Sequence, residues 1–153
     1  MSIKGKIKLI DKLEIKHIRN QKVIEEKVIE NELEDIITNV GKAQVAGLIN
    51  GVVTTPFQYI AIGTGTTPES ATDTALQNEI MRALATCSRV TTNVTNDTAQ
   101  LVYTFTFTAS YAITESGVFD ASTGGNMLCR RVFSAVNVVS GDSLQVTWKI
   151  VVS

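Results

Sequence analysis

Apolar and polar residues alternate along the end of the chain, in "SLQVTWKIVVS". This two-residue period places one set of side chains on a single face of a β-strand. The apolar face comprises Leu144, Val146, Trp148, Ile150 and Val152. Because the chain ends in a long, regular strand, we expect that strand to lie centrally in its sheet.

A second alternating stretch is "AQLVYTFTFTA", and further strand-length runs surround it. Its apolar face comprises Leu101, Tyr103, Phe105 and Phe107, opposite Thr104, Thr106 and Thr108. The other runs are "FQYIAIG", "RALATCSRVTTNV", "YAITESGVFDA", "NMLCRRVF" and "SAVNVV", with turns at "TNDT", "STGG" and "SGDS". The last turn is expected to join "SAVNVV" and the final strand as a pair. These patterns predict a mainly β fold, an antiparallel β-sandwich that is jelly-roll-like.

Helical signals are confined to two short segments. In "TNVGKAQVAGLING" (38–51), Thr38 or Asn39 is suited to cap the start and Gly51 to end the helix. Gly41 and Gly47 weaken this helix, unless they permit close packing on a sheet. A second short helix is predicted from about Asp73 to Met81.

Charge divides the chain into two parts. Residues 1–36 hold 16 of the 29 charged side chains, eight of each sign, and the other 117 residues hold 13. We call residues 1–36 the N-terminal arm and residues 37–153 the body, the predicted β-sandwich. In the arm, "IKGKIKLI" alternates like a strand and "RNQK" (19–22) is a polar turn of a hairpin. Strand is favoured over helix for residues 22–36, although Glu and Lys suit a helix. A β-ribbon with this many charges buries little apolar surface by itself. It therefore needs the body or a neighbouring molecule to pack against.

The overall charge balance excludes strong attraction to nucleic acid or an anionic membrane. The net charge is −1 and the pI is near 5.8. The arm has one series of basic residues that could contact nucleic acid. However, no aromatic residue precedes Phe57, and eight acidic residues share the arm. A solvated face, or contact with an acidic protein, is therefore favoured over nucleic-acid binding. The series is Lys4, Lys6, Lys8, Lys12 and Lys16. No apolar run has the length of a membrane span, and the N-terminus has no signal-peptide core, so synthesis in a cytoplasm is expected.

The stretch "YIAIGTGTTPESATDTAL" (59–76) has the form of a nucleotide-binding loop. A dinucleotide-binding turn needs a third glycine where this chain has Pro68, and a phosphate-binding P-loop needs a lysine. No Lys or Arg occurs between Lys42 and Arg82. We therefore interpret Gly63 and Gly65 as a structural turn that needs positive φ angles, at a strand-to-helix corner.

Catalytic and metal-binding residues are not predicted. His17 is the single histidine and lies in the arm, far from a nucleophile motif, so a hydrolytic triad is not indicated. Cys87 and Cys129 lack metal-ligand spacing and are expected to be buried, unpaired residues. Glu115 and Asp120 lie an odd number of residues apart in one strand, on opposite faces, which does not suit a carboxylate pair.

Glu115 is nevertheless unusual, because it is a charged residue in an otherwise charge-poor body. We expect it to make a turn or interface contact, with Arg82, Arg130 or Arg131 as its partner. The sequence thus predicts no catalytic residue, no cofactor and no metal site.

The body resembles small virion structural proteins of tailed bacteriophages. The resemblance is carried by the helix 38–51, "YIAIGTGTT", "DTAL" and "ITESGVFDASTGGNMLCRR", followed by "DSLQVTWKI". It covers roughly residues 38–153, and the arm is similar to the variable N-terminal hairpin of such proteins. It implies a virion protein made in the bacterial cytoplasm, without catalytic residues to transfer.

The expected function is structural. Our first hypothesis is a capsid decoration (cement) protein that binds the major capsid protein through residues 1–36, as a homo-oligomer that we expect to be a trimer. The alternatives are a tail, baseplate or fibre-associated protein, or a receptor- or carbohydrate-binding module. The last would need an exposed aromatic platform from Trp148, Tyr59, Tyr103 or Tyr111. Nucleic acid and membrane are not expected partners.

Overall fold

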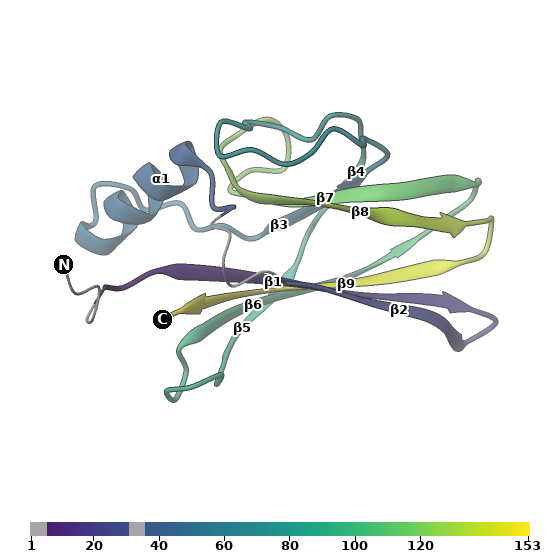
Figure 1. Cartoon of the computed structure of the whole chain (residues 1–153), viewed down its shortest axis with the longest axis horizontal. Helices are drawn as coiled ribbons and strands as arrows, with labels where there is room; N and C mark the ends of the chain where they lie inside the picture. The colour runs from purple at the N-terminus through teal and green to yellow at the C-terminus, as the bar shows by residue number, and fades with distance from the viewer. Residues whose placement is uncertain (1–5, 31–35) are drawn as a thin grey trace.

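The computed structural model describes residues 6–30 and 36–153, which form two packed antiparallel sheets and one helix (Figure 1). The elements in chain order are β1 (Leu9–Arg19), β2 (Lys22–Glu30), α1 (Asn39–Asn50), β3 (Tyr59–Gly63), β4 (Glu79–Leu84), β5 (Thr86–Val90), β6 (Thr98–Thr106), β7 (Tyr111–Phe119), β8 (Met127–Val138) and β9 (Ser143–Val152). One sheet has the order β2-β1-β9-β6-β5 and the other β4-β3-β7-β8. The predicted β-sandwich is confirmed.

The final strand lies at the centre of the five-stranded sheet, as predicted. β9 pairs with β1 from Leu9↔Val152 to Ile18↔Ser143 and with β6 on its other side. Four members of its predicted apolar face are buried, whereas Val152 is exposed. Trp148 is fully buried, and its indole Nε1 donates to Ser116 Oγ on the facing sheet at 3.0 Å.

The N-terminal hairpin is confirmed over the described residues. Asn20 and Gln21 at its tip have φ angles of 52° and 63°, the two positive values that a tight two-residue hairpin turn requires. Residues 22–30 form a strand, so the helical alternative is wrong there. Residues 1–5 and 31–35 lie outside the described part, and Lys6–Lys8 precede the strand.

The sandwich itself supplies the support that the hairpin needs. Leu13 and Ile15 of β1 are buried in the main core with Trp148 and with residues of the other sheet such as Ile113 and Val136. β1 is thus an interior strand of its sheet, between β2 and β9. Strand β2 forms the edge.

Helix α1 begins and ends where the sequence predicts. The Thr38 side chain accepts a hydrogen bond from the Gly41 amide at 2.9 Å, and Gly51 ends the helix with φ of 81°. Gly41 also permits close packing on a sheet, since a Cβ there would lie 2.8 Å from the backbone oxygen of Leu128 in β8. The helix therefore lies directly against the β8 backbone at one end of the sandwich (Figure 1).

The prediction of a second helix, from Asp73 to Met81, is wrong. Residues 64–78 form turns and irregular structure, and β4 begins at Glu79. The amides of Gln77 and Asn78, which a helix would bond to its own carbonyls, donate to the side chain of Glu115 instead. A tertiary contact overrides the local helical pattern here.

Two strand assignments also differ from the prediction. The run "RALATCSRVTTNV" divides at Ala85, whose amide bonds to Gln58 O, so that β4 and β5 lie in different sheets. The runs "NMLCRRVF" and "SAVNVV" form the single strand β8, which passes a register shift in its pairing with β7. β8 and β9 do not pair, because the turn 140–143 crosses between the sheets.

Since β1 is interior, a core substitution in it should destabilise the whole sandwich. Leu13→Ala is expected to lower the free energy of unfolding by about 2–5 kcal/mol, measured by urea denaturation. Ile7→Ala, at a residue just before β1 that is 80% exposed, is the matched control and should change it by less than about 0.5 kcal/mol. Equal effects of the two substitutions would contradict the interior position of β1.

Candidate functional site

The glycine-rich turn 63–65 encloses a carboxylate of the protein itself. Glu115 on β7 is fully buried, and its Oε2 accepts hydrogen bonds from the amides of Gly65 at 2.7 Å and Asn78 at 2.8 Å. Its Oε1 accepts from the amide of Gln77 at 2.9 Å. The Gly65 amide is therefore occupied by Glu115, and the other amides of the turn have acceptors within the protein as well: Thr64 donates to Asn78 O, and Thr66 and Thr67 donate to Gln77 Oε1.

The physical reason for the two glycines differs from the one expected. Neither Gly63 nor Gly65 has a positive φ, so the expectation of positive φ angles is wrong. A Cβ on Gly63 would lie 2.7 Å from Glu115 Oε2 and would also collide with Asn78 O. A Cβ on Gly65 would collide with Glu115 Oε2 and with the Gln77 side chain. Glycine is needed because the backbone approaches the buried carboxylate closely.

Arg130 on β8 is the partner of Glu115 among the three arginines considered. It is 2% exposed, and its Nε donates to Glu115 Oε1 at 2.9 Å. Its other nitrogens reach the loop, where Nη1 donates to Asp73 Oδ2 at 3.1 Å and Nη2 to Thr67 O at 2.8 Å. One guanidinium thus fixes the segment 64–78 to β8.

The surroundings of Glu115 keep its carboxylate ionised. Burial by itself raises the pKa of Glu115, but the amides of Asn78 and Gln77, the Arg130 guanidinium and the Gly65 amide together outweigh it. The pKa of Glu115 therefore lies below its usual value. A carboxylate held in this way stabilises a loop and is not poised to exchange a proton at neutral pH.

A second buried ion pair joins the two sheets. Arg131 on β8 donates from Nε to Asp11 Oδ2 at 2.8 Å and from Nη2 to Asp11 Oδ1 at 3.2 Å, a bidentate arrangement. Both side chains are buried, and Asp11 belongs to β1. Neighbouring arginines on β8 therefore hold different parts of the chain, Arg130 the loop and Arg131 the first strand.

His17 serves a third buried contact rather than a catalytic site. Its Nε2 donates to Asp142 Oδ2 at 2.8 Å, and Arg19 donates to both oxygens of the same carboxylate at 2.9 Å. Asp142 also accepts from the amide of Val139, which closes the turn between β8 and β9. The hydrogen bonds from Arg19, His17 and Val139 hold the pKa of Asp142 well below its usual 3.8.

Asp120 and Arg82 stabilise another turn. Asp120 accepts hydrogen bonds from the amide and side chain of Asn126 at 2.7 and 2.9 Å. Arg82 lies 3.7 Å above the ring of Phe119 and donates to backbone oxygens of Ala121 and Gly124. Glu115 and Asp120 thus bind separate loops, and Asp120 lies just beyond the end of β7 rather than in the same strand as Glu115.

The two cysteines are unlike each other. Cys129 is buried as expected, and burial raises its pKa well above the usual value. The expectation that Cys87 is buried is wrong, since it is exposed on β5. Residues 6–30 and 36–153 contain no group of three or more His, Cys, Asp or Glu side chains arranged to bind a metal ion.

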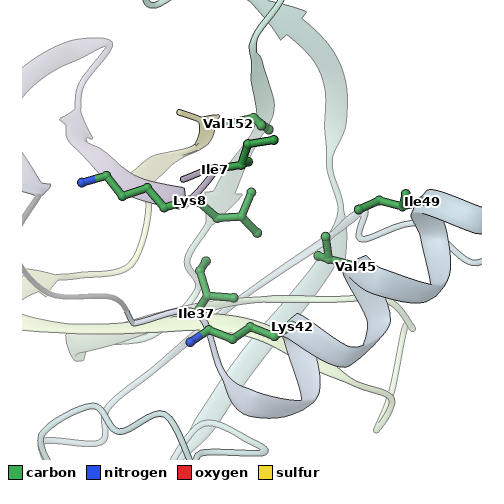
Figure 2. A pocket seen from close by; sticks show the side chains of 8 residues that line it. Ile7, Lys8, Ile37, Lys42, Val45, Ile49 and Val152 are labelled. Atoms are coloured by element: carbon green, nitrogen blue, oxygen red, sulfur yellow. The ribbon is translucent and has the colours of Figure 1, made fainter. Parts of the chain in front are cut away.

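An apolar groove of about 530 Å³ opens between α1 and the paired ends of β1 and β9 (Figure 2). In Figure 2, Val45 and Ile49 extend from the helix, while Ile7 and Val152 lie on the opposite side. Ile7, Ile49 and Val152 are exposed to solvent. Because the lining of the groove is mainly aliphatic, the groove offers a surface for apolar contacts.

Comparison with known proteins identifies the chain's family. Residues 37–152 match the family described as "Podophage GP4 fiber I protein gp80". The chain belongs to this family. It is therefore a phage virion structural protein of a tail-fibre family, and not an enzyme. No curated protein and no solved structure matches it. In the part of the chain that the structure describes, no helix has the length and apolar character needed to cross a membrane.

The match to the fiber I family includes β7, β8 and the loop 64–78, which the buried Glu115 and Arg130 hold together. It begins at residue 37, after the β1–β2 hairpin. The general prediction of a phage virion structural protein is confirmed, and the match favours the fibre-associated alternative over the capsid decoration protein.

Removing the Glu115 charge should leave Arg130 buried without its main partner. Glu115→Gln is expected to lower the free energy of unfolding by about 3–5 kcal/mol, measured by urea denaturation at neutral pH. Glu14→Gln is the control, because Glu14 is partly exposed and pairs with Lys149 at 3.4 Å; it should cost about 0–1 kcal/mol. A Glu115→Gln variant as stable as this control would contradict a structural role for the carboxylate.

Acid should weaken the fold through the carboxylates whose pKa values are depressed. The folded-state pKa of Asp142 lies below its unfolded value, so its stabilising contribution is present above about pH 5 and is lost as pH falls. Asp142→Asn is expected to be less stable than the wild type at neutral pH and to lose less stability on acidification to about pH 2.5. Denaturation curves at several pH values check this, and equal acid sensitivity of both proteins would disprove it.

Proposed function

We propose that this chain is a structural component of the tail fibres of a podophage, and not a capsid decoration protein. The single observation that carries this proposal is the family match over residues 37–152. That range contains α1 and seven of the nine strands, so the likeness concerns the sandwich as a whole.

The interior of the sandwich suits a structural part. Two ion pairs lie in its interior, Glu115–Arg130 and Asp11–Arg131. Within the described residues, every buried side-chain nitrogen or oxygen atom has a hydrogen-bond partner. Buried pairs of this kind favour one arrangement of loops and strands, because any other arrangement leaves a charge unpaired.

A receptor- or carbohydrate-binding module has little support in the aromatic residues. Trp148 is fully buried and bonded to Ser116, so it is not available to a ligand. Tyr59 and Tyr111 are partly buried and pack against the hydrophobic clusters. Tyr103 is 37% exposed, and its ring stacks edge-on against Phe105. These residues come from different strands and do not make an aromatic platform.

The N-terminal arm remains the proposed contact with other virion proteins, but a deletion is a poor test of it. Removing residues 1–36 would take away β1, expose the edge of β9 and break the Asp11–Arg131 pair. Loss of binding after such a deletion would then report unfolding. Point substitutions at exposed positions of β2 avoid this difficulty.

The location in the particle tests the proposed function directly. Heads and tails of the phage that encodes this chain would be separated, and peptides of the chain quantified by mass spectrometry in each fraction. We expect the peptides in the tail fraction, with gold-labelled antibody bound at the fibres of intact particles. Major capsid protein peptides serve as the control for separation. Recovery in the head fraction would overturn the proposal in favour of a decoration protein.

A further inference from the structure

Strand β2 leaves one edge of the five-stranded sheet open. β1 lies on one side of it, and among residues 6–30 and 36–153 no strand pairs with the other side. Three apolar side chains on this strand are exposed: Val23 and Ile24 at 49% each and Val28 at 58%. An open edge with exposed apolar side chains is a template for backbone pairing with another chain.

The sequence of β2 is complementary to itself when read in the opposite direction. In "KVIEEKVIE", antiparallel pairing about Glu26 sets Glu25 opposite Lys27 of a second copy and Ile24 opposite Val28. Opposite charges and apolar pairs directly across two strands each stabilise a sheet. The two Glu26 residues meet at the axis, where they form the one unfavourable pair of the central segment.

Symmetry leaves one register that has this complementarity. Directly opposite residues of antiparallel strands share a face of the sheet, so the two-fold axis must pass midway between the two copies of one residue, which we describe as an axis through that residue. An axis through Glu25 would set Ile24 against Glu26. An axis through Lys27 would set Val28 against Glu26. Both place a charge against an apolar side chain, so Glu26 is the centre that fits.

The bulge in β2 does not disturb the central pairs. Glu25 pairs with His17 and Val23 with Ile18, which leaves Ile24 as an extra residue without a partner on β1. Whichever of Val23 and Ile24 stands opposite Val28 of the second copy, the contact is apolar. Glu25, Glu26 and Lys27 lie on the regular side of the bulge.

We propose that β2 pairs antiparallel with β2 of a second copy of this chain, about a two-fold axis through Glu26. This joins two five-stranded sheets into one continuous sheet across the dimer. A closed two-fold contact gives a dimer in place of the trimer expected from the sequence. The pairing does not depend on the place of the protein in the virion.

Exchange of the charges beside the axis tests the pairing. Sedimentation of the full chain over a range of concentrations should show a monomer–dimer equilibrium. Glu25→Lys and Lys27→Glu each create two repulsive pairs across the axis and should raise the dimer Kd about tenfold, whereas the double variant should restore it to within about threefold. Glu26→Thr removes the repulsion at the axis and should lower the Kd severalfold.

The contrary outcomes are equally specific. A monomer at all concentrations, a trimer, or a double variant that is no better than the single ones would each overturn the proposal. Circular dichroism of every variant verifies that the sandwich remains folded.

A cross-link tests the register. Because Cys87 is exposed, the background carries Cys87→Ser. Glu26→Cys then places two thiols directly opposite each other and should form an intermolecular disulfide under mild oxidation. Glu30→Cys is the matched control on the same strand, since its two copies would lie about 26 Å apart, eight residues along a strand. Failure of Glu26→Cys to cross-link, or equal cross-linking of the control, would overturn this register.

Discussion

The buried carboxylate of Glu115 is the contact on which one end of the sandwich depends. It accepts hydrogen bonds from Gly65, Gln77 and Asn78, and it pairs with Arg130. A charge in the interior is costly unless it is paired and fully hydrogen-bonded. These bonds hold the loop 64–78 against β7 and β8, between the paired strands β3 and β4.

The same principle fastens the first strand to the sandwich. Asp11 pairs with Arg131 near one end of β1, and near the other end His17 and Arg19 bind Asp142. Between these contacts Leu13 and Ile15 enter the core. Asp11, His17 and Arg19 thus fasten β1 to the sandwich, whereas β2 carries its charges at the edge of the sheet.

A well-packed sandwich with an open sheet edge suits a virion structural protein. The elements within the family match, from α1 to β9, contain the buried network around Glu115, whereas β2 lies outside that match. Assembly contacts need a surface that is stable before the partner arrives, because ordering a loop on binding costs free energy. An edge strand fastened through β1 offers its backbone donors and acceptors in fixed positions.

Local features of the sequence determined the elements that depend on near neighbours in the chain. The two-residue period identified β9 and its buried face, the turn at Asn20 and Gln21 identified the hairpin, and Thr38 and Gly51 bounded the helix. Each of these signals is read within a few residues, so the sequence by itself is sufficient. The charge-poor body likewise made Glu115 conspicuous, with Arg130 among its possible partners.

Only the tertiary structure decided the features that join distant residues. Glu115 meets Gly65 across 50 positions, and Asp11 meets Arg131 across 120. The contacts of Glu115 hold residues 64–78 as a loop where the sequence predicted a helix at 73–81, and they require glycine at 65 for space rather than for a positive φ. They depend on which strands become neighbours, and that is settled when the two sheets pack and each buried charge must find a partner.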